Sequence, residues 1–153
     1  KNGIESTIIG FENDEPIIYR LGALALEDIE AVIGKVEVKN KVKENPDAPG
    51  MLDKHYSPLT ATILTTDVAS EIKKHPTKKI GILTFKTSFK GAEIMTEIIL
   101  SKNNDLQEAA SKLYDALHEL DHLNLDVIIA EKMPETGLGN SMNDRLQRAA
   151  FRL

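Results

Sequence analysis

The chain has 153 residues with a formal net charge of −5; 41% of the residues are hydrophobic and 28% are charged, which suits one globular domain or a small domain with an appendage. It contains no cysteine, which excludes a disulfide framework, and its acidic balance without a basic stripe argues against direct nucleic-acid binding. No apolar run is long enough to span a bilayer and no signal peptide opens the chain, so we expect a cytoplasmic protein without membrane contact.

The first forty residues predict a small hairpin followed by a helix. Residues 4–9 are apolar and β-branched, residues 16–20 form a second strand-like run, and the polar stretch GFENDE separates them. Apolar side chains at helical spacing predict a helix over residues 26–34, and residues 35–39 alternate like a short edge strand. A strand that begins so early requires a partner, and we therefore expect Lys1 to be the start of a fragment of a longer protein.

Residues 40–59 differ from the rest of the chain, because they contain three prolines and many charges and follow neither period. A segment of this length without regular structure is usually a linker or a functional loop. It contains Lys54, His55 and Tyr56, three consecutive polar-tipped side chains between two proline-containing turns. Lysine and histidine can hold phosphate oxygens and tyrosine can stack or donate a hydrogen bond, so these three are candidate binding residues.

From residue 60 onward, strands and helices alternate strictly. The pattern predicts strands over residues 60–66, 78–85, 93–100 and 125–133, and helices over residues 67–75, 104–124 and 139–150. This order predicts a Rossmann-like, largely parallel sheet with helices on both faces. No G-x-G-x-x-G follows the first strand, so the dinucleotide-binding fingerprint is missing.

The long predicted helix carries the phrase HELDH at residues 118–122, which fits the zinc-hydrolase pattern H-E-x-x-H. The helix also has an apolar stripe, formed by Leu106, Ala109, Ala110, Leu113, Leu117, Leu120 and Asn124, that we expect to face the core. His118 and His122 fall on the polar side of this stripe, and no third ligand continues a zincin signature. We therefore predict a solvated helix end and no metal site, with a zinc hydrolase as a weaker alternative that metal analysis would test.

Two further groups of polar residues are candidate anion sites. The glycine-rich turn before the last helix offers free N–H groups to an anion, although Asn140 or Ser141 can equally be plain N-caps. Arg145 and Arg148 on that helix would face either an anion or solvent. This turn favours an alternative function, a non-catalytic module that binds a small ligand or a partner. Near the other end of the chain, hydroxyl side chains and Arg20 on neighbouring strands, with Ser6 and Thr7 as the hydroxyls, suit a carboxylate or phosphate.

Four phrases in this order, GIESTII, YRLGAL, APGMLDKHYSP and PETGLGNSMNDRLQRAA, give the chain a family resemblance. It resembles the C-terminal part of the two-domain L-threonylcarbamoyladenylate synthases of the YrdC family. The resemblance implies that residues 1–34 are the terminal strands and helix of a YrdC-like α/β catalytic domain, that residues 35–59 are a linker acting as a lid, and that residues 60–153 are a Rossmann-like accessory domain.

The resemblance also implies an activity for the intact protein. These synthases, which are nucleotidyltransferases, condense L-threonine, bicarbonate and ATP with Mg²⁺ into threonylcarbamoyl-AMP and pyrophosphate, for the N6-threonylcarbamoyladenosine modification of tRNA. Ser6 would then contact threonine, and Arg20 would contact ATP or pyrophosphate together with the three linker residues. No catalytic residue and no tightly bound cofactor is implied for this chain, and its own N-terminal catalytic domain would be its partner.

Two departures from the family pattern matter for this expectation. The family's R-P-G segment reads Arg20-Leu21-Gly22 here, which removes the preset φ of proline but keeps the arginine. Most of the catalytic domain is also absent from the sequence, including its lysine- and arginine-rich face. Because the chemistry requires charge stabilisation at the transferring phosphates, we expect the chain alone to be inactive.

Overall fold

The structure is a computed structural model that describes residues 4–39, 57–91 and 93–150. The predicted binding residues of the linker, Lys54, His55 and Tyr56, lie outside the described residues. An N-terminal segment, residues 4–39, contains β1 (Ile8–Glu12), β2 (Glu15–Arg20), α1 (Leu26–Ile33) and β3 (Glu37–Val38). A larger α/β unit follows, with β4 (Thr62–Thr65), α2 (Val68–Lys73), β5 (Ile80–Thr84), β6 (Ile94–Ile99), α3 (Leu106–Asp121), β7 (Val127–Glu131) and α4 (Leu138–Ala150).

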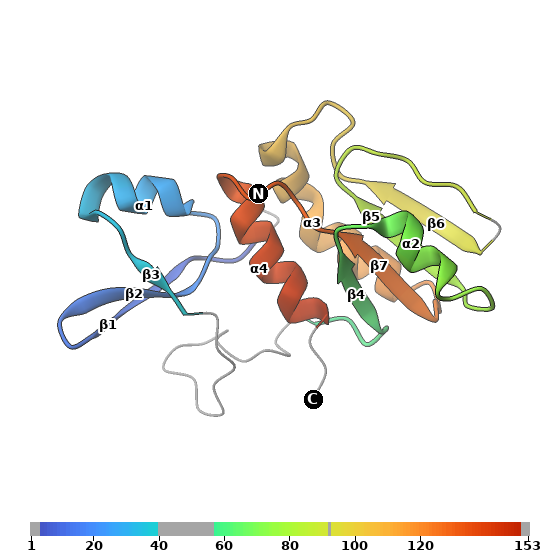
Figure 1. The fold of residues 1–153 in the computed structure, drawn as a ribbon, viewed down its shortest axis with the longest axis horizontal. Coiled ribbons are helices and arrows are strands. Elements are labelled where there is room, and N and C mark those ends of the chain that lie inside the picture. The colour runs from blue at the N-terminus through green and yellow to red at the C-terminus, as the bar shows by residue number, and fades with distance from the viewer. Residues whose placement is uncertain (1–3, 40–56, 92, 151–153) are drawn as a thin grey trace.

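The α/β unit is built on a four-stranded sheet in the order β4-β7-β5-β6, and all of its pairings are parallel. Every residue of β5 is buried, and four of the five residues of β7 are buried as well. Strands covered on both faces are expected to be continuously apolar, as these two are. One face packs against α2 and the other against α3 and α4 (Figure 1). The predicted Rossmann-like parallel sheet with helices on both faces is confirmed.

Helix α3 buries most of the predicted apolar stripe. Its buried residues are Ala109, Ala110, Leu113, Ala116, Leu117 and Leu120. The helix begins at the N-cap Asp105, whose carboxylate accepts hydrogen bonds from the backbone N–H groups of Gln107 and Glu108. Asn124 was predicted to lie on the stripe, but it is exposed with φ 54°. The prediction is wrong there because the helix ends at Asp121, and Asn124 takes a left-handed conformation in the exit turn.

The N-terminal segment forms a separate three-stranded sheet in the order β1-β2-β3. β1 and β2 pair in an antiparallel hairpin whose turn consists of Asn13 and Asp14, with φ of 52° and 64°. Two consecutive positive φ values are typical of a type I′ turn, which asparagine and aspartate tolerate. The strand therefore runs through Gly10 and Phe11, where the sequence predicted a longer loop, and it ends at Glu12.

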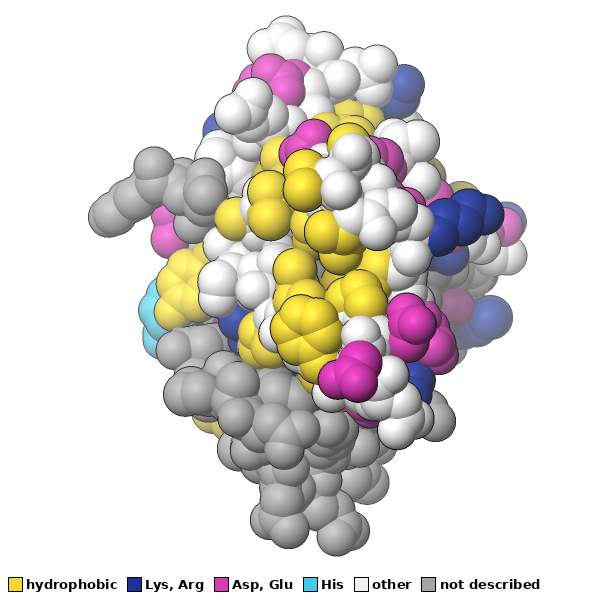
Figure 2. Space-filling model, turned by 90° about the vertical axis from the view of Figure 1, so that its left-hand side faces the viewer, with side chains coloured by type: hydrophobic (Ala, Val, Ile, Leu, Met, Phe, Trp, Pro, Cys, Tyr) yellow, Lys and Arg dark blue, Asp and Glu magenta, His cyan; other side chains and the backbone are white. Residues whose placement is uncertain are grey.

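The outer face of the N-terminal segment is unusually apolar. Figure 2 shows apolar side chains gathered in a band on the side of the molecule where this segment lies. The large exposed apolar residues of the segment are Ile9, Phe11, Leu24, Val32 and Ile33, with Phe11 73% and Val32 83% exposed. Contiguous exposed apolar surface on a small protein usually marks an interaction site. In the described ranges, α1 to α4 include no helix that is long and apolar enough to cross a bilayer.

Candidate functional site

The structure brings Ser6 and Arg20 together, although they are fourteen positions apart in the chain. Arg20 is the last residue of β2 and is only 5% exposed. Its guanidinium donates from Nε to the carbonyl of Ser6 (3.0 Å) and from Nη2 to the Ser6 hydroxyl (3.2 Å). Its Nη1 lies 3.7 Å from Oε2 of Glu5. A buried arginine thus holds an exposed serine in place, and a hydroxyl beside a guanidinium is an arrangement that binds carboxylates and phosphates.

Gly22 allows the segment that follows β2 to lie directly against residues 5–7. The Thr7 hydroxyl accepts from the N–H of Gly22 (3.0 Å) and donates to the carbonyl of Leu24 (2.8 Å), while the N–H of Ala23 donates to the carbonyl of Glu5 (2.7 Å). A Cβ atom at position 22 would lie 2.2 Å from the Glu5 carbonyl oxygen. The glycine is therefore required by close backbone approach to residues 5–7, which carry the serine.

Helix α4 holds this site from the other side (Figure 1). The Asp144 carboxylate accepts from the N–H of Leu21 (2.8 Å), the residue after Arg20. Arg148 donates from Nη2 to the carbonyl of Tyr19 (3.2 Å), and its Nε lies 3.4 Å from Asp144. The end of β2 is thus fixed to a helix of the α/β unit through contacts that span more than a hundred residues.

Arg145 extends this network to Glu5. Its Nε lies 3.7 Å from Oε1 of Glu5, whose other oxygen faces Arg20. The sequence left open whether Arg145 and Arg148 face an anion or solvent. Both are buried, 4% and 9% exposed respectively, and both contact the N-terminal segment.

Burial shifts the ionisation of this network. Burial raises the pKa of Asp144, although the nearby Arg148 guanidinium and the hydrogen bond from Leu21 act in the opposite direction. Burial likewise lowers the pKa of Arg145 from its ordinary value, and the Glu5 carboxylate opposes this shift. Removing charged groups from water has a cost, so the network stabilises the site only while its partners stay in place.

The glycine-rich turn before α4 is occupied by the protein itself. The N–H of Gly137, which has φ 51°, donates to Oε1 of Glu27 from α1 (2.8 Å). The N-cap predictions for Asn140 and Ser141 are wrong, because α4 already begins at Leu138 and both residues lie inside it. The anion geometry predicted from the sequence is thus met by a carboxylate of the N-terminal segment, and the turn gives no support to a separate ligand-binding module.

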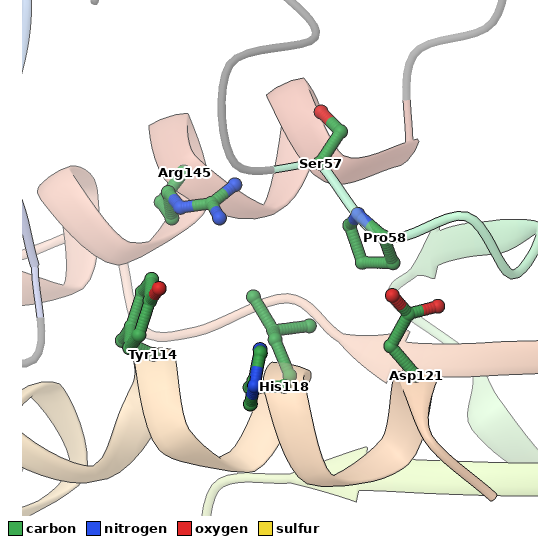
Figure 3. A pocket seen from close by; sticks show the side chains of 7 residues that line it. Ser57, Pro58, Tyr114, His118, Asp121 and Arg145 are labelled. Carbon is green, nitrogen blue, oxygen red and sulfur yellow. The ribbon is translucent and has the colours of Figure 1, made fainter.

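A pocket of about 230 Å³ lies between α3 and α4, where the chain continues from the linker (Figure 3). Arg145 from α4 and Tyr114 from α3 extend into the space between the helices, and Pro58 closes one side. The Asp121 carboxylate accepts from the N–H and the hydroxyl of Thr60, both at 2.9 Å. Although burial raises the pKa of Asp121, these hydrogen bonds outweigh it, and the pKa is lowered overall. The chain after the linker is therefore fastened to α3.

The HELDH phrase lies at the end of α3, and its two histidines are exposed. The rings of His118 and His122 are 4.4 Å apart between centroids, and Nδ1 of His122 donates to the carbonyl of His118 (2.8 Å). His118 also stacks on Tyr114 and lines the pocket, while both histidines remain exposed on the polar side of the helix. Across residues 4–39, 57–91 and 93–150, no three metal-ligating side chains converge.

Several of these residues had no signal in the sequence that pointed to their partners. Glu5 and Asp144 each connect the Ser6–Arg20 pair to α4, but each is one acidic residue among 24 in the chain. The only available hint was the pattern of Asp144, Arg145 and Arg148, which places an acid and a base one helical turn apart. That spacing predicts the ion pair within α4 but not its contact with β2.

The fold and the site together define a class of protein: a Rossmann-like α/β unit that holds, through one helix, a β-hairpin with a buried arginine on its second strand and an exposed serine just before its first. Residues 24–151 match the family model described as threonylcarbamoyl-AMP synthase, C-terminal domain. The chain belongs to this family, as the sequence motifs predicted.

Known relatives extend the match over nearly the whole chain. The threonylcarbamoyl-AMP synthase of Bacillus subtilis is 34% identical over 97% of this chain, which covers 45% of the relative. The crystal structure of Pyrococcus abyssi Sua5 complexed with L-threonine superposes with a TM-score of 0.78 at 30% identity, covering 96% of this chain and 46% of that one. A P. abyssi Sua5 variant with an adjacent histidine and tyrosine both replaced by alanine gives 0.76 at 29% identity, with 97% and 45% covered. The chain therefore spans less than half the length of these relatives.

Proposed function

We propose that this chain is the C-terminal part of a two-domain threonylcarbamoyl-AMP synthase. The intact enzyme would join L-threonine, bicarbonate and ATP into threonylcarbamoyl-AMP and release pyrophosphate, as a nucleotidyltransferase in tRNA modification. The observation that carries this proposal is the Ser6–Arg20 pair, in which the serine is exposed and the arginine lies between two residues whose backbone α4 binds. Residues 1–34 would complete the catalytic domain, residues 35–59 would form the lid, and residues 60–153 would hold both in place.

Ser6 and Arg20 suit the two kinds of anion in this reaction. The hydroxyl of Ser6 is exposed and already oriented by the guanidinium, so we assign it to the threonine substrate. Arg20 carries a permanent charge and five donors, and we assign it to the phosphates of ATP. A relative solved in complex with L-threonine supports the choice of substrate. ATP would enter with Mg²⁺ as a substrate, and we assign no metal ligand and no tightly bound cofactor to this chain.

The partner of the N-terminal segment would be the remainder of the catalytic domain. The apolar band of Figure 2 lies on this segment, next to the strand pair that carries the site. Fully burying a side chain such as Phe11 or Val32 contributes about 2 kcal/mol, so several of them together provide a stable interface. A domain docked there would place its own nucleotide-binding side chains near Ser6 and Arg20.

The linker would close over the bound substrates and exclude water from the carbamoyl intermediate. His55 and Tyr56 are the only adjacent histidine and tyrosine in this sequence, and such a pair was replaced in the P. abyssi variant. Ser57, the next residue, donates from its hydroxyl to the carbonyl of Arg148 (3.0 Å). The helix that binds the backbone on either side of Arg20 thus also binds the end of the linker, which supports a lid anchored beside the site.

Replacing His55 and Tyr56 by alanine in the protein that includes the catalytic domain is expected to lower threonylcarbamoyl-AMP synthesis about a hundredfold, because a misplaced lid costs orientation and water exclusion. Product formation can be followed by chromatography of the adenylate. The matched control is His122→Ala, an exposed histidine at the C-cap of α3, which should leave the rate unchanged. Unchanged kinetics in the His55 and Tyr56 double variant would contradict the role of the lid.

A further inference from the structure

The parallel sheet has a second feature that the proposed synthase function does not use, a topological switch point between β4 and β7. These strands are neighbours in the sheet. β4 leads into α2 on one face, whereas β7 leads into α4 on the other. In open parallel sheets, ligands bind in the crevice outside the carboxyl ends of two such strands, where the connections diverge. The topology alone therefore predicts a binding position at the carboxyl ends of β4 and β7.

A cavity lies at the carboxyl ends of these strands. Its volume is about 510 Å³, and it is lined by residues at the carboxyl ends of three neighbouring strands: Thr66 after β4, Phe85, Lys86 and Thr87 after β5, and the stretch from Glu131, the last residue of β7, to Glu135. A volume of several hundred Å³ is typical of sites for small molecules. The cavity shares no lining residue with the pocket between α3 and α4, and it contains neither Ser6 nor Arg20.

The base of the crevice is rigid and its rim is charged. Phe85 and Met133 are 4% and 2% exposed, and both are fixed by hydrogen bonds through their backbone. The N–H of Phe85 donates to Oε1 of Glu131 (2.9 Å), and the N–H of Met133 donates to Oδ1 of Asn143 (2.7 Å). Asn143 returns a hydrogen bond from Nδ2 to the carbonyl of Met133 (2.9 Å). The loop after β7 therefore keeps its shape without a ligand, as a preformed site requires.

The lining of the crevice has two lysines and two glutamates, and the Glu131 carboxylate already accepts from the N–H of Phe85. Lys86 and Lys132 approach from the ends of β5 and β7, and Thr66 and Thr87 add hydroxyl donors. Lys132 pairs with Glu135, a mostly exposed carboxylate that a ligand can displace at little cost. Among the described residues, the exposed side chain of Lys86 is in no hydrogen bond or ion pair. This anion site is also distinct from the start of α4, where Glu27 already accepts from Gly137.

We propose that the crevice at the carboxyl ends of β4, β7 and β5 binds a small organic anion. Its carboxylate or phosphate would lie between Lys86 and Lys132, and its carbon part would cover Phe85 and Met133. The α/β unit would then carry a ligand site of its own, separate from the synthase substrates. This inference does not depend on the proposed synthase function and holds or fails on binding to the 153-residue chain.

The test is a titration of the ¹⁵N-labelled chain, followed by amide chemical shifts, with three probes: inorganic phosphate, adenosine 5′-monophosphate and L-lactate. The expected result is saturable binding, on the order of 1 mM or tighter, with shifts confined to Thr66, residues 85–87 and residues 131–135. Response to phosphate and the nucleotide alone identifies a phosphate ligand, and response to lactate identifies a carboxylate. The same spectra report whether each variant remains folded.

The double variant Lys86→Glu with Lys132→Glu should weaken this binding at least tenfold. The matched control is Lys73→Glu with Lys102→Glu, which changes the net charge equally at two exposed lysines outside the crevice. If none of the three probes shifts the crevice amides up to about 10 mM, or if the control variant weakens binding as much, the proposed site is refuted.

Discussion

Replacing Gly22 by alanine is expected to destabilise the packing of the N-terminal segment by about 3 kcal/mol. The added Cβ would lie 2.2 Å from the Glu5 carbonyl oxygen, 2.4 Å from the carbonyl carbon of Ser6 and 2.5 Å from the nitrogen of Thr7. All three atoms belong to the backbone, so no side chain can rotate to relieve the clash. The substitution must therefore separate residues 5–7 from residues 20–22 and displace Ser6 from Arg20.

Hydrogen exchange distinguishes this local effect from global unfolding. The amides of β2, Ile17 to Arg20, should lose protection in Gly22→Ala, whereas the amides of β5 and β7 should keep theirs. Gly91→Ala is the control, because the nearest atom to an added Cβ there is the carboxylate oxygen of Glu93 at 3.2 Å, at the end of a flexible side chain. Equal protection of β2 in both variants would show that the close approach at Gly22 is not required.

Truncating Asp144 to alanine is expected to cost about 3 kcal/mol in the free energy of unfolding, because it leaves buried groups without a partner. The N–H of Leu21 loses its acceptor, and Arg148 loses a carboxylate at 3.4 Å. Asp144→Asn keeps an acceptor for Leu21 and should lose less. Urea unfolding of the three proteins measures the difference, and a loss below about 1 kcal/mol for Asp144→Ala would contradict the role of this contact.

The pH dependence of this contact has a definite sign. Burial raises the pKa of Asp144 in the folded chain above 3.8, the ordinary value that it has in the unfolded chain. At a pH between 3.8 and the raised pKa, the folded chain therefore binds more protons than the unfolded chain. Its contribution to stability is therefore complete below pH 3.8 and falls as the pH rises through the raised pKa. Relative to Asp144→Asn, the wild type should lose stability over this window. Asp121 has a lowered pKa and provides the opposite control, since its stabilisation is lost as the pH falls below 3.8.

The sequence predicted the elements whose patterns depend only on local burial. The apolar runs of β5 and β7 and the stripe on α3 reflect a core that each element contacts on its own, so their existence and type were readable. The residue pattern also placed Ser6 and Arg20 close together, and they are in contact in the structure. The pattern put both on strands, which is wrong for Ser6, because β1 begins only at Ile8. The hairpin itself was predicted, but its turn is the two residues Asn13 and Asp14 rather than the longer loop GFENDE.

The environment of α4 could not be predicted in the same way. This helix has a polar composition, yet nine of its thirteen residues are buried, because it lies between the parallel sheet and the N-terminal segment (Figure 1). Its charged side chains contact Glu5, Tyr19 and Leu21, which are more than a hundred residues away. Helical periodicity identifies a face but not the element that covers it. The pairing of Gly137 with Glu27 was unreadable for the same reason.

The central claim is that this chain supplies a site and a lid to a catalytic domain and does not perform the synthesis alone. The most direct measurement is threonylcarbamoyl-AMP formation from L-threonine, bicarbonate and ATP, assayed with the 153-residue chain and with the protein that also includes the catalytic domain. The account predicts the adenylate only when that domain is present. Formation of the adenylate by the 153-residue chain alone, at a comparable rate, would contradict it.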